Sequence, residues 1–260
     1  DYKNIAIVML NGVECAPYLT IDHRIMVETE TAKKVLTGLQ ALMKITEAEQ
    51  GYIGIEDNKP DAIAKMKELA ADFTNVEIVP LETKYPQGGE KQLIDAVLGR
   101  EVPSGGLPLD VGVVVNNTGT SLAIAEAIEE GKPLIERAVT VTGAVEEPKN
   151  FIVRVGTPIE ELIEACGGFK GTPGKVVLGG PMTGKAQSKL DVPATKGTSG
   201  VLVLTKAEVE QHPEASSCIR CARCVDACPI KLMPTKLVKR AKNDAVEALE
   251  EYNVLDCIEC

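Results

Sequence analysis

Tryptophan is absent from this sequence, and aromatic residues of all kinds make up only 3% of its 260 positions. Proteins that hold single-stranded nucleic acid stack its bases on aromatic side chains, so this class of function is disfavoured. Basic residues are outnumbered, with 28 Lys and Arg against 38 Asp and Glu, whereas nucleic-acid binding needs a basic surface. No apolar run approaches the roughly 20 residues that span a bilayer. We therefore expect no nucleic-acid partner and no direct membrane span.

What the chain has instead is an aliphatic core and a cluster of cysteines. Hydrophobic residues make up 44% of the sequence, as expected of a globular protein. Six of the eight cysteines lie between Cys218 and Cys260. Clustering at one end of a large chain indicates metal binding rather than a disulfide framework. The two isolated cysteines, Cys15 and Cys166, are predicted to be small buried residues, with Cys166 at the end of a helix.

The first part of the chain alternates between strand-like and helix-like patterns. Short apolar runs predict buried strands, and apolar residues at helical spacing predict the helices between them. Asn58 stands where a helix cap is expected. This alternation predicts an α/β fold, in which helices cover a parallel sheet. The expected strands are residues 4–10, 51–57, 76–81 and 111–115, and the expected helices are 31–45, 58–70, 91–98 and 122–130.

The rest of the chain divides into two smaller regions. In the first, strand-like segments surround a short helix at 156–168, which predicts a small α+β module. In the second, two cysteine clusters are bridged by a helical pattern over 237–252, which predicts a helical ferredoxin-like module. The strand-like segments are 137–145, 151–155, 175–184 and 200–205, and the predicted domains are 1–135, 136–205 and 206–260.

The first cysteine cluster has a specific spacing. Cys218, Cys221, Cys224 and Cys228 follow the pattern C-x-x-C-x-x-C-x-x-x-C, and Pro229 comes next. This is the ligand spacing of two-cluster ferredoxins, in which the first three thiolates bind one [4Fe–4S] cluster and the fourth binds the other. Soft thiolate ligands suit iron–sulfur centres. The spacing therefore predicts two [4Fe–4S] clusters.

Structural zinc is the alternative for this region, with Cys218, Cys221, Cys257 and Cys260 as its ligands. Zinc would leave Cys224 and Cys228 without a role, so the pattern favours iron–sulfur clusters. By the two-cluster rule, Cys228 joins Cys257 and Cys260, and each cluster then has three of its four ligands. The remaining ligands would lie beyond Cys260, so we expect the sequence to be cut in mid-motif.

Three polar loops follow predicted strands, at the sheet edge where parallel α/β domains bind ligands. Gly88 and Gly89 open a helix and could cradle a phosphate on backbone N–H groups, and Asn116 with Asn117 could bond a polar heterocycle. Each feature also has a plainer interpretation as turn chemistry. The Asp22-His23-Arg24 run is interpreted as structural, and "GGPMTG" as a turn. The loops are residues 10–24, 84–93 and 115–121, and none carries a G-x-G-x-x-G motif.

The segments "NGVECAPYLTIDHRIM", "YPQGGEKQLI" and "VNNTGT", followed by the cysteine pattern, resemble the C subunit of Rnf-type membrane complexes, the ferredoxin:NAD oxidoreductases. That subunit is similar to the flavoprotein subunit of respiratory NADH dehydrogenase. The resemblance extends over essentially the whole chain. It implies a Rossmann-like FMN/NADH domain, then a β-grasp module of the soluble-ligand-binding (SLBB) type, then a helical module with two [4Fe–4S] clusters.

The resemblance also implies which residues contact the flavin. Val13 and Gly89 replace acidic residues of the respiratory subunit, a departure that bears on the NADH contacts. The family's glycine-rich phosphate loop would precede residue 1, so we expect the sequence to be cut at this end too. The implied flavin-contacting residues are Asn11 and Glu14 in the first loop, Tyr85, Gly88 and Glu90 in the second, and Asn116, Asn117 and Thr120 in the third.

For function, the resemblance implies that NAD(H) exchanges a hydride with FMN and that single electrons pass to or from two [4Fe–4S] clusters. The implied partners are NAD(H), the other subunits of a membrane-bound electron-transport complex and, indirectly, ferredoxin. The chain would be a peripheral subunit on the cytoplasmic face of the cell membrane, with ion transport elsewhere in the complex. Two alternatives stay open: a cobalamin reductase of similar architecture, and a non-catalytic iron–sulfur carrier or scaffold.

Overall fold

The protein is described by a computed structural model that covers residues 5–210 and 216–260. Residues 1–4 and 211–215 lie outside this part. The predictions that fall partly on them are the strand 4–10 and the domains 1–135 and 206–260.

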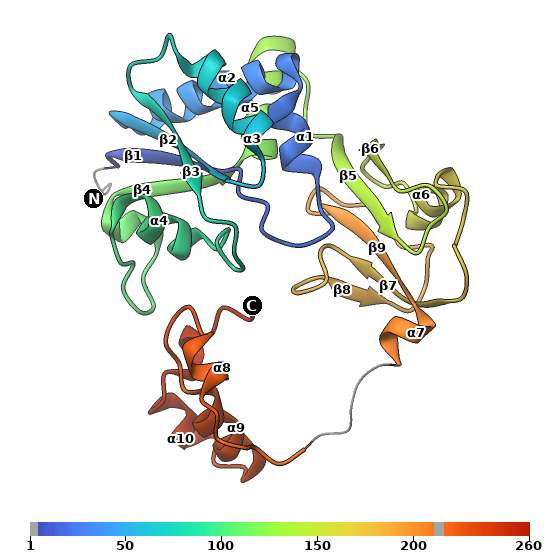
Figure 1. The fold of residues 1–260 in the computed structure, drawn as a ribbon. Helices are drawn as coiled ribbons and strands as arrows, with labels where there is room; N and C mark the ends of the chain where they lie inside the picture. Colours follow the sequence, from blue (N-terminus) through green and yellow to red (C-terminus); the bar gives the residue numbers. More distant parts are fainter. Residues whose placement is uncertain (1–4, 211–215) are drawn as a thin grey trace. The chain divides into compact units, whose positions relative to one another are not determined.

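The chain forms two compact units, Asp1–Glu210 and Gln211–Cys260 (Figure 1). The first unit contains two β-sheets, one fully parallel and one mixed. In residues 216–260 of the second unit, the structure has only short helices and connecting turns.

The parallel sheet is the one that the alternating pattern predicts. Its strand order is β3-β2-β1-β4, and each neighbouring pair is parallel. Parallel neighbours require crossover connections, which helices supply. The carboxyl ends of all four strands therefore meet at one edge. The strands are β1 (Ile7–Asn11), β2 (Gln50–Glu56), β3 (Val76–Leu81) and β4 (Val113–Asn117).

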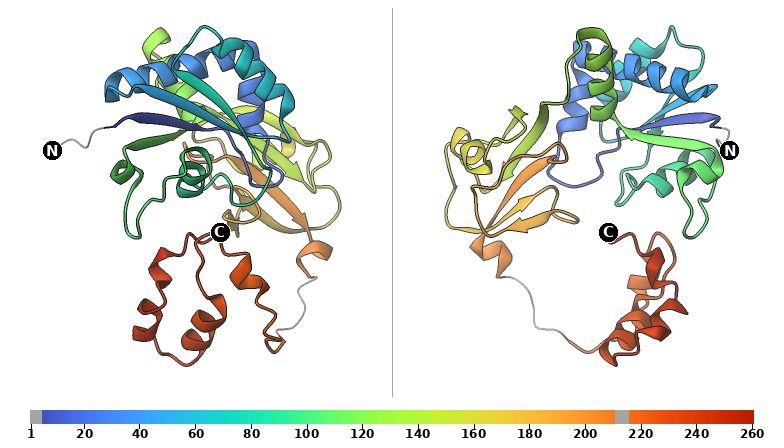
Figure 2. Two further views of the ribbon diagram at one scale, coloured as in Figure 1. Left: turned by 60° about the vertical axis from the view of Figure 1, so that its left-hand side comes forward. Right: turned by 180° about the vertical axis from the view of Figure 1, so that it is seen from behind.

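Helices cover both faces of this sheet, with α2, α3 and α5 on one face and α4 on the other (Figure 2). Alternate residues of β1 supply the two cores: Val8 and Leu10 pack under the first group, and Ile7 and Met9 pack against the α4 side. Burial on both faces explains why the strand reads as a continuous apolar run. The helices are α1 (Ile21–Val27), α2 (Thr29–Thr46), α3 (Pro60–Ala70), α4 (Glu90–Leu98) and α5 (Thr118–Glu130), with a 3-10 turn η1 (Pro108–Val111).

Two local predictions differ from the structure. The loop expected at 10–24 ends in helix α1, whose buried residues Ile21, Ile25 and Met26 have helical spacing. The cap expected at Asn58 is wrong, because Lys59 occupies the N-cap of α3 and its side chain does not cap the helix. Pro60 at the first helical position needs no hydrogen-bond partner for its nitrogen and begins the helix instead.

The second sheet has the order β6-β5-β9-β7-β8, and helix α6 (Ile159–Ala165) packs on it. Val139, Val141, Ile159 and Val201 are fully buried in its core. Cys166, at the end of α6, is also fully buried, as predicted. The strands are β5 (Glu136–Gly143), β6 (Lys149–Arg154), β7 (Pro173–Leu178), β8 (Lys185–Gln187) and β9 (Gly200–Thr205).

Helix α7 (Lys206–Val209) follows β9 directly and contacts β7 and β9. A reciprocal pair of hydrogen bonds between Thr205 and Glu208 caps its start. Residues 206–209, placed in the cysteine module by sequence, thus pack on the second sheet.

The second unit is helical, as expected, but the helix expected over 237–252 is broken. Asp244 has a left-handed backbone with φ of 51°, which ends α9 and separates it from α10. Asn and Asp tolerate this conformation better than most residues. The elements are α8 (Arg223–Asp226), α9 (Pro234–Lys242), α10 (Glu247–Glu250) and the 3-10 turn η2 (Val254–Asp256).

Candidate functional site

A hollow of about 520 Å³ lies at the carboxyl edge of the parallel sheet. It is bordered by the loop after β1 and by the residues that follow β2 and β3. In open parallel sheets, ligands bind outside this edge. Residues that line the hollow include Glu14, Cys15, Tyr18, Glu56, Lys59 and Tyr85.

The first two loops are bonded to each other at Gly88. The Asn11 amide donates to the Gly88 carbonyl at 2.7 Å, and the Gly88 N–H donates to the Cys15 sulfur at 3.2 Å. A Cβ atom at Gly88 would lie 3.0 Å from that sulfur, so a larger residue would force the sulfur to shift by a few tenths of an ångström. Cys15 is half-buried, whereas the sequence predicts a buried residue, and partial burial raises the pKa of its thiol.

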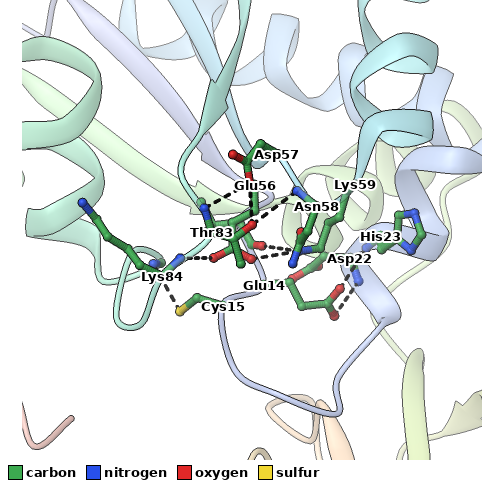
Figure 3. A network of polar contacts seen from close by, with 12 residues as sticks. Glu14, Cys15, Asp22, His23, Glu56, Asp57, Asn58, Lys59, Thr83 and Lys84 are labelled. Carbon is green, nitrogen blue, oxygen red and sulfur yellow. Dashed lines mark hydrogen bonds and ion pairs between the residues drawn. The ribbon is translucent and has the colours of Figure 1, made fainter.

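Glu14 links the first loop to helix α1. Its two carboxylate oxygens accept hydrogen bonds from the backbone N–H groups of Asp22 and His23, each at 3.0 Å (Figure 3). The carboxylate therefore caps the start of α1 from seven positions upstream of Ile21. Burial, with a smaller effect from the Asp22 charge, raises the pKa of Glu14 to about 7.

Asp22 continues this connection to the third loop. Its carboxylate, which is buried, accepts from the Asn117 amide at 2.9 Å and from the Thr118 hydroxyl at 2.7 Å. The Asn117 oxygen in turn accepts from the Gly119 N–H at 2.8 Å and caps α5. Burial raises the pKa of Asp22 as well. These contacts give Asp22 the structural role that the sequence suggested.

A buried ion pair lies beneath the same loops. The ammonium of Lys59 is 3.0 Å from the Glu56 carboxylate, and neither residue is more than 7% exposed. The sequence predicts Glu56 in the strand 51–57 and Lys59 in the helix 58–70, and it marks neither as a site residue. The sequence does contain a signal for a buried lysine: Lys59 lies three residues after the strand end at Glu56 and directly before Pro60, which begins a helix.

The eight predicted flavin-contacting residues all lie at this edge of the sheet, but they do not line one hollow. Glu14 and Tyr85 line the large one. Asn117 and Thr120 line a separate hollow of about 90 Å³, which also includes Arg137 of β5. Asn11 and Gly88 bond to each other, Glu90 is the first residue of α4, and Asn116 is in β4 next to its last residue.

The second sheet and one of its turns contact the loop that follows β1. The Thr20 N–H donates to the Thr140 hydroxyl of β5 at 3.2 Å. In the turn predicted at 179–184, a Cβ atom on Gly180 would lie 2.9 Å from the Cβ of Ala16. The glycine turn is therefore packed against the loop that borders the hollow.

The cysteine module shows two local features around its sulfur atoms. In two C-x-x-C segments, the residue before the second cysteine is left-handed: Arg220, with φ of 58°, and Glu259, with φ of 53°. Backbone N–H groups approach the sulfurs, from Arg220 to Cys218 at 3.4 Å and from Leu232 to Cys228 at 3.3 Å. Across residues 5–210 and 216–260, no three Cys, His, Asp or Glu side chains are close enough together to hold a metal ion.

Comparison with known proteins shows which proteins the chain resembles. The chain is 54% identical, over 98% of its length, to the C subunit of the proton-translocating ferredoxin:NAD(+) oxidoreductase complex of Clostridium ljungdahlii. It is 48% identical, again over 98% of its length, to the C subunit of the Na(+)-translocating complex of Acetobacterium woodii. Over nearly its whole length, the chain is therefore similar to the C subunits of these complexes. The predicted resemblance to Rnf-type C subunits is thus confirmed, and the chain spans 55% and 57% of the length of these two relatives.

Two family models match parts of this chain: the Nuo51 FMN-binding domain over residues 1–126 and the SLBB domain over 138–186. An NAD+-reducing [NiFe]-hydrogenase, solved in the H2-reduced state, contains a chain with a similar fold, with a TM-score of 0.61 and 20% identity. The alignment covers 76% of this chain and 40% of that one. The predicted fold class, a parallel-sheet FMN-type domain followed by an SLBB module, is confirmed. None of the described helices has the length and apolar character needed to cross a membrane.

The raised pKa of Glu14 predicts a pH-dependent stability. Between its ordinary pKa of 4.5 and the raised pKa of about 7, the folded state binds more protons than the unfolded state, so the free energy of unfolding falls as pH rises. Asp22 contributes in the same direction. We expect the free energy of unfolding to fall by on the order of 2 kcal/mol between pH 5 and 8. In the Glu14→Gln variant this fall should be clearly smaller. Urea unfolding at several pH values measures both slopes.

Glu28→Gln is the matched control, because Glu28 is an exposed glutamate of the same segment, paired with Arg24 at 2.6 Å. It should keep the wild-type slope. If stability depends on pH equally in the Glu14→Gln variant and in the wild type, the raised pKa of Glu14 does not cause the pH dependence.

Proposed function

We propose that this chain is the flavin- and cluster-bearing part of the C subunit of an ion-translocating ferredoxin:NAD oxidoreductase, an electron-transfer enzyme complex. The observation that carries the proposal is the hollow of about 520 Å³ at the carboxyl edge of the parallel sheet, within the segment that matches the Nuo51 FMN-binding domain. The relatives' names supply the class of reaction.

The residues at this edge fit a flavin. Gly88 lets the first two loops approach closely, and Glu14 and Tyr85 line the space between them. The residues that would hold FMN are the eight named above, from Asn11 to Thr120. When bound, FMN exchanges a hydride with NAD(H) and releases electrons one at a time, which amino-acid side chains do not do. Glu14 would hold or release a proton at its carboxyl group near neutral pH, beside the ligand.

The cysteine module fits iron–sulfur clusters by its donor chemistry. The module supplies six thiols, the ligand type that such clusters use, and backbone N–H groups donate to two of the sulfurs, those of Cys218 and Cys228. In the proposal, Cys218, Cys221 and Cys224 bind one [4Fe–4S] cluster, and Cys228, Cys257 and Cys260 bind the other. These clusters would carry single electrons between the flavin and the rest of the complex.

The partners are proposed on the same basis. They are NAD(H), the other subunits of a membrane-bound complex and, through them, ferredoxin. The chain would be a peripheral subunit on the cytoplasmic face of the membrane.

An anaerobic titration of the full-length protein with NADH tests the proposal, with flavin and iron assays alongside. We expect the flavin and iron–sulfur absorbance bands to bleach together. Iron–sulfur colour without flavin and without any response to NADH would overturn the enzyme proposal. It would leave a non-catalytic electron carrier as the better account.

A further inference from the structure

Lys59 makes an unusual set of contacts for a lysine. It is only 7% exposed, and lysines are almost never buried without partners. Its ammonium donates to the Val13 carbonyl at 2.9 Å, to Glu56 at 3.0 Å and to the Asn58 side chain at 3.0 Å (Figure 3). An ammonium group has three protons. All of them are used within the protein, so Lys59 has none left for a ligand.

Glu56 extends the connection to the second loop. It is the last residue of β2 and is 2% exposed. One of its oxygens accepts from Lys59, and the other accepts from the Lys84 N–H at 3.3 Å. The pair therefore joins the first loop at Val13, the end of β2, and the loop after β3 at Lys84.

The anchored backbone atoms are next to the proposed flavin contacts. Val13 directly precedes Glu14, and Lys84 directly precedes Tyr85, the two predicted residues that line the large hollow. We propose that Lys59 and Glu56 are a positioning pair, which sets the spacing of these two loops for the cofactor. This inference rests on the proposed function.

Stability alone is a poor explanation for the pair. Removing two charges from water is costly, and apolar residues of similar size often replace a buried ion pair with no loss of stability. An apolar pair would not supply the bonds to the Val13 carbonyl and the Lys84 N–H. Those two bonds are the contribution specific to the charged residues.

The test uses the full-length protein and the double variant Lys59→Met/Glu56→Leu. Lys59→Met alone would leave Glu56 buried and unpaired, and that variant is at risk of not folding. For the double variant we expect a thermal midpoint close to that of the wild type but at least about tenfold weaker binding of FMN, roughly 1.4 kcal/mol. Lys65→Met/Glu68→Leu is the matched control, since this exposed pair in α3 has a similar separation of 2.8 Å.

Hydrogen–deuterium exchange of the flavin-free protein provides a second readout. In the double variant, exchange should become faster in residues 12–20 and 82–90, whereas the strands β1 and β2 stay protected. Wild-type FMN affinity together with unchanged exchange in these loops would overturn the inference. If the wild type itself binds no FMN, the proposed function fails, while the exchange data still decide whether the pair holds the loops.

Discussion

Replacing Cys221 by serine is expected to remove about four of the iron atoms of the full-length protein, the content of one [4Fe–4S] cluster. Cys221 is the middle ligand of the three that the spacing assigns to the first cluster, and serine is a poor ligand for iron–sulfur centres because its oxygen is hard where thiolate is soft. The other proposed cluster, with Cys228, Cys257 and Cys260 as its ligands, should remain. Iron assays and electron paramagnetic resonance of the reduced protein measure the loss.

Cys166→Ala is the matched control for this experiment. Cys166 is fully buried at the end of α6, within the core of the second sheet. Its removal should leave the iron content unchanged, even if the small cavity lowers stability. Full iron content in the Cys221→Ser variant would contradict the cluster assignment.

Replacing Asp22 by alanine is expected to lower the free energy of unfolding of the first unit by about 3 kcal/mol. Asp22 accepts two hydrogen bonds while buried, and a bond to a charged group contributes about 1.5–3 kcal/mol. We use the low end of this range, about 1.5 kcal/mol for each of the two bonds. Burial raises the pKa of Asp22 and so disfavours its charged form. The hydroxyl of Thr118, which is fully buried, would also lose its acceptor. Urea unfolding at neutral pH measures the change.

Asp61→Ala is the comparison for Asp22. Asp61 is an exposed aspartate whose side chain pairs with His23 at 2.8 Å, and exposed pairs contribute at most about 1 kcal/mol. Asp22→Asn keeps the shape of the side chain and one acceptor oxygen. Its loss of unfolding free energy should lie between those of the two alanine variants. If Asp22→Ala costs no more than Asp61→Ala, the contacts with the third loop do not stabilise the fold.

The sequence predicts the parallel sheet well because the central strands β1 and β2 are largely buried, and a helical pattern separates each strand from the next. It fails at α1, where the feature that caps the helix is not next to it. Thr20, at the N-cap, makes no side-chain cap, and Glu14 supplies the bonds instead. A pattern read along the chain does not reveal a cap that comes from a loop. The break at Asp244 is different, since Asn243 and Asp244 are visible as poor helix formers.

In the candidate site, too, some features could be predicted from the sequence and others could not. Its loops could be located from the sequence because they follow strands of one parallel sheet. The contacts that fix them could not be predicted, because they depend on which residues the fold brings together. Asp22 and Asn117 are 95 positions apart. Lys59 is buried because the neighbouring strands β1 and β2 bring Val13 and Glu56 to its ammonium group.

Two glycines in and beside the second sheet pack tightly against the loop that follows β1. This packing limits which SLBB modules could replace the one in this chain. A Cβ atom at Gly200 would collide with a methyl group of Leu19, and one at Gly180 would lie 2.9 Å from Ala16. An SLBB module grafted from another protein would push this loop away from the hollow unless it carried glycine at both places. The FMN-type domain and the SLBB module match separate family models, but in this chain the second sheet and its glycine turn pack against a loop of the first domain.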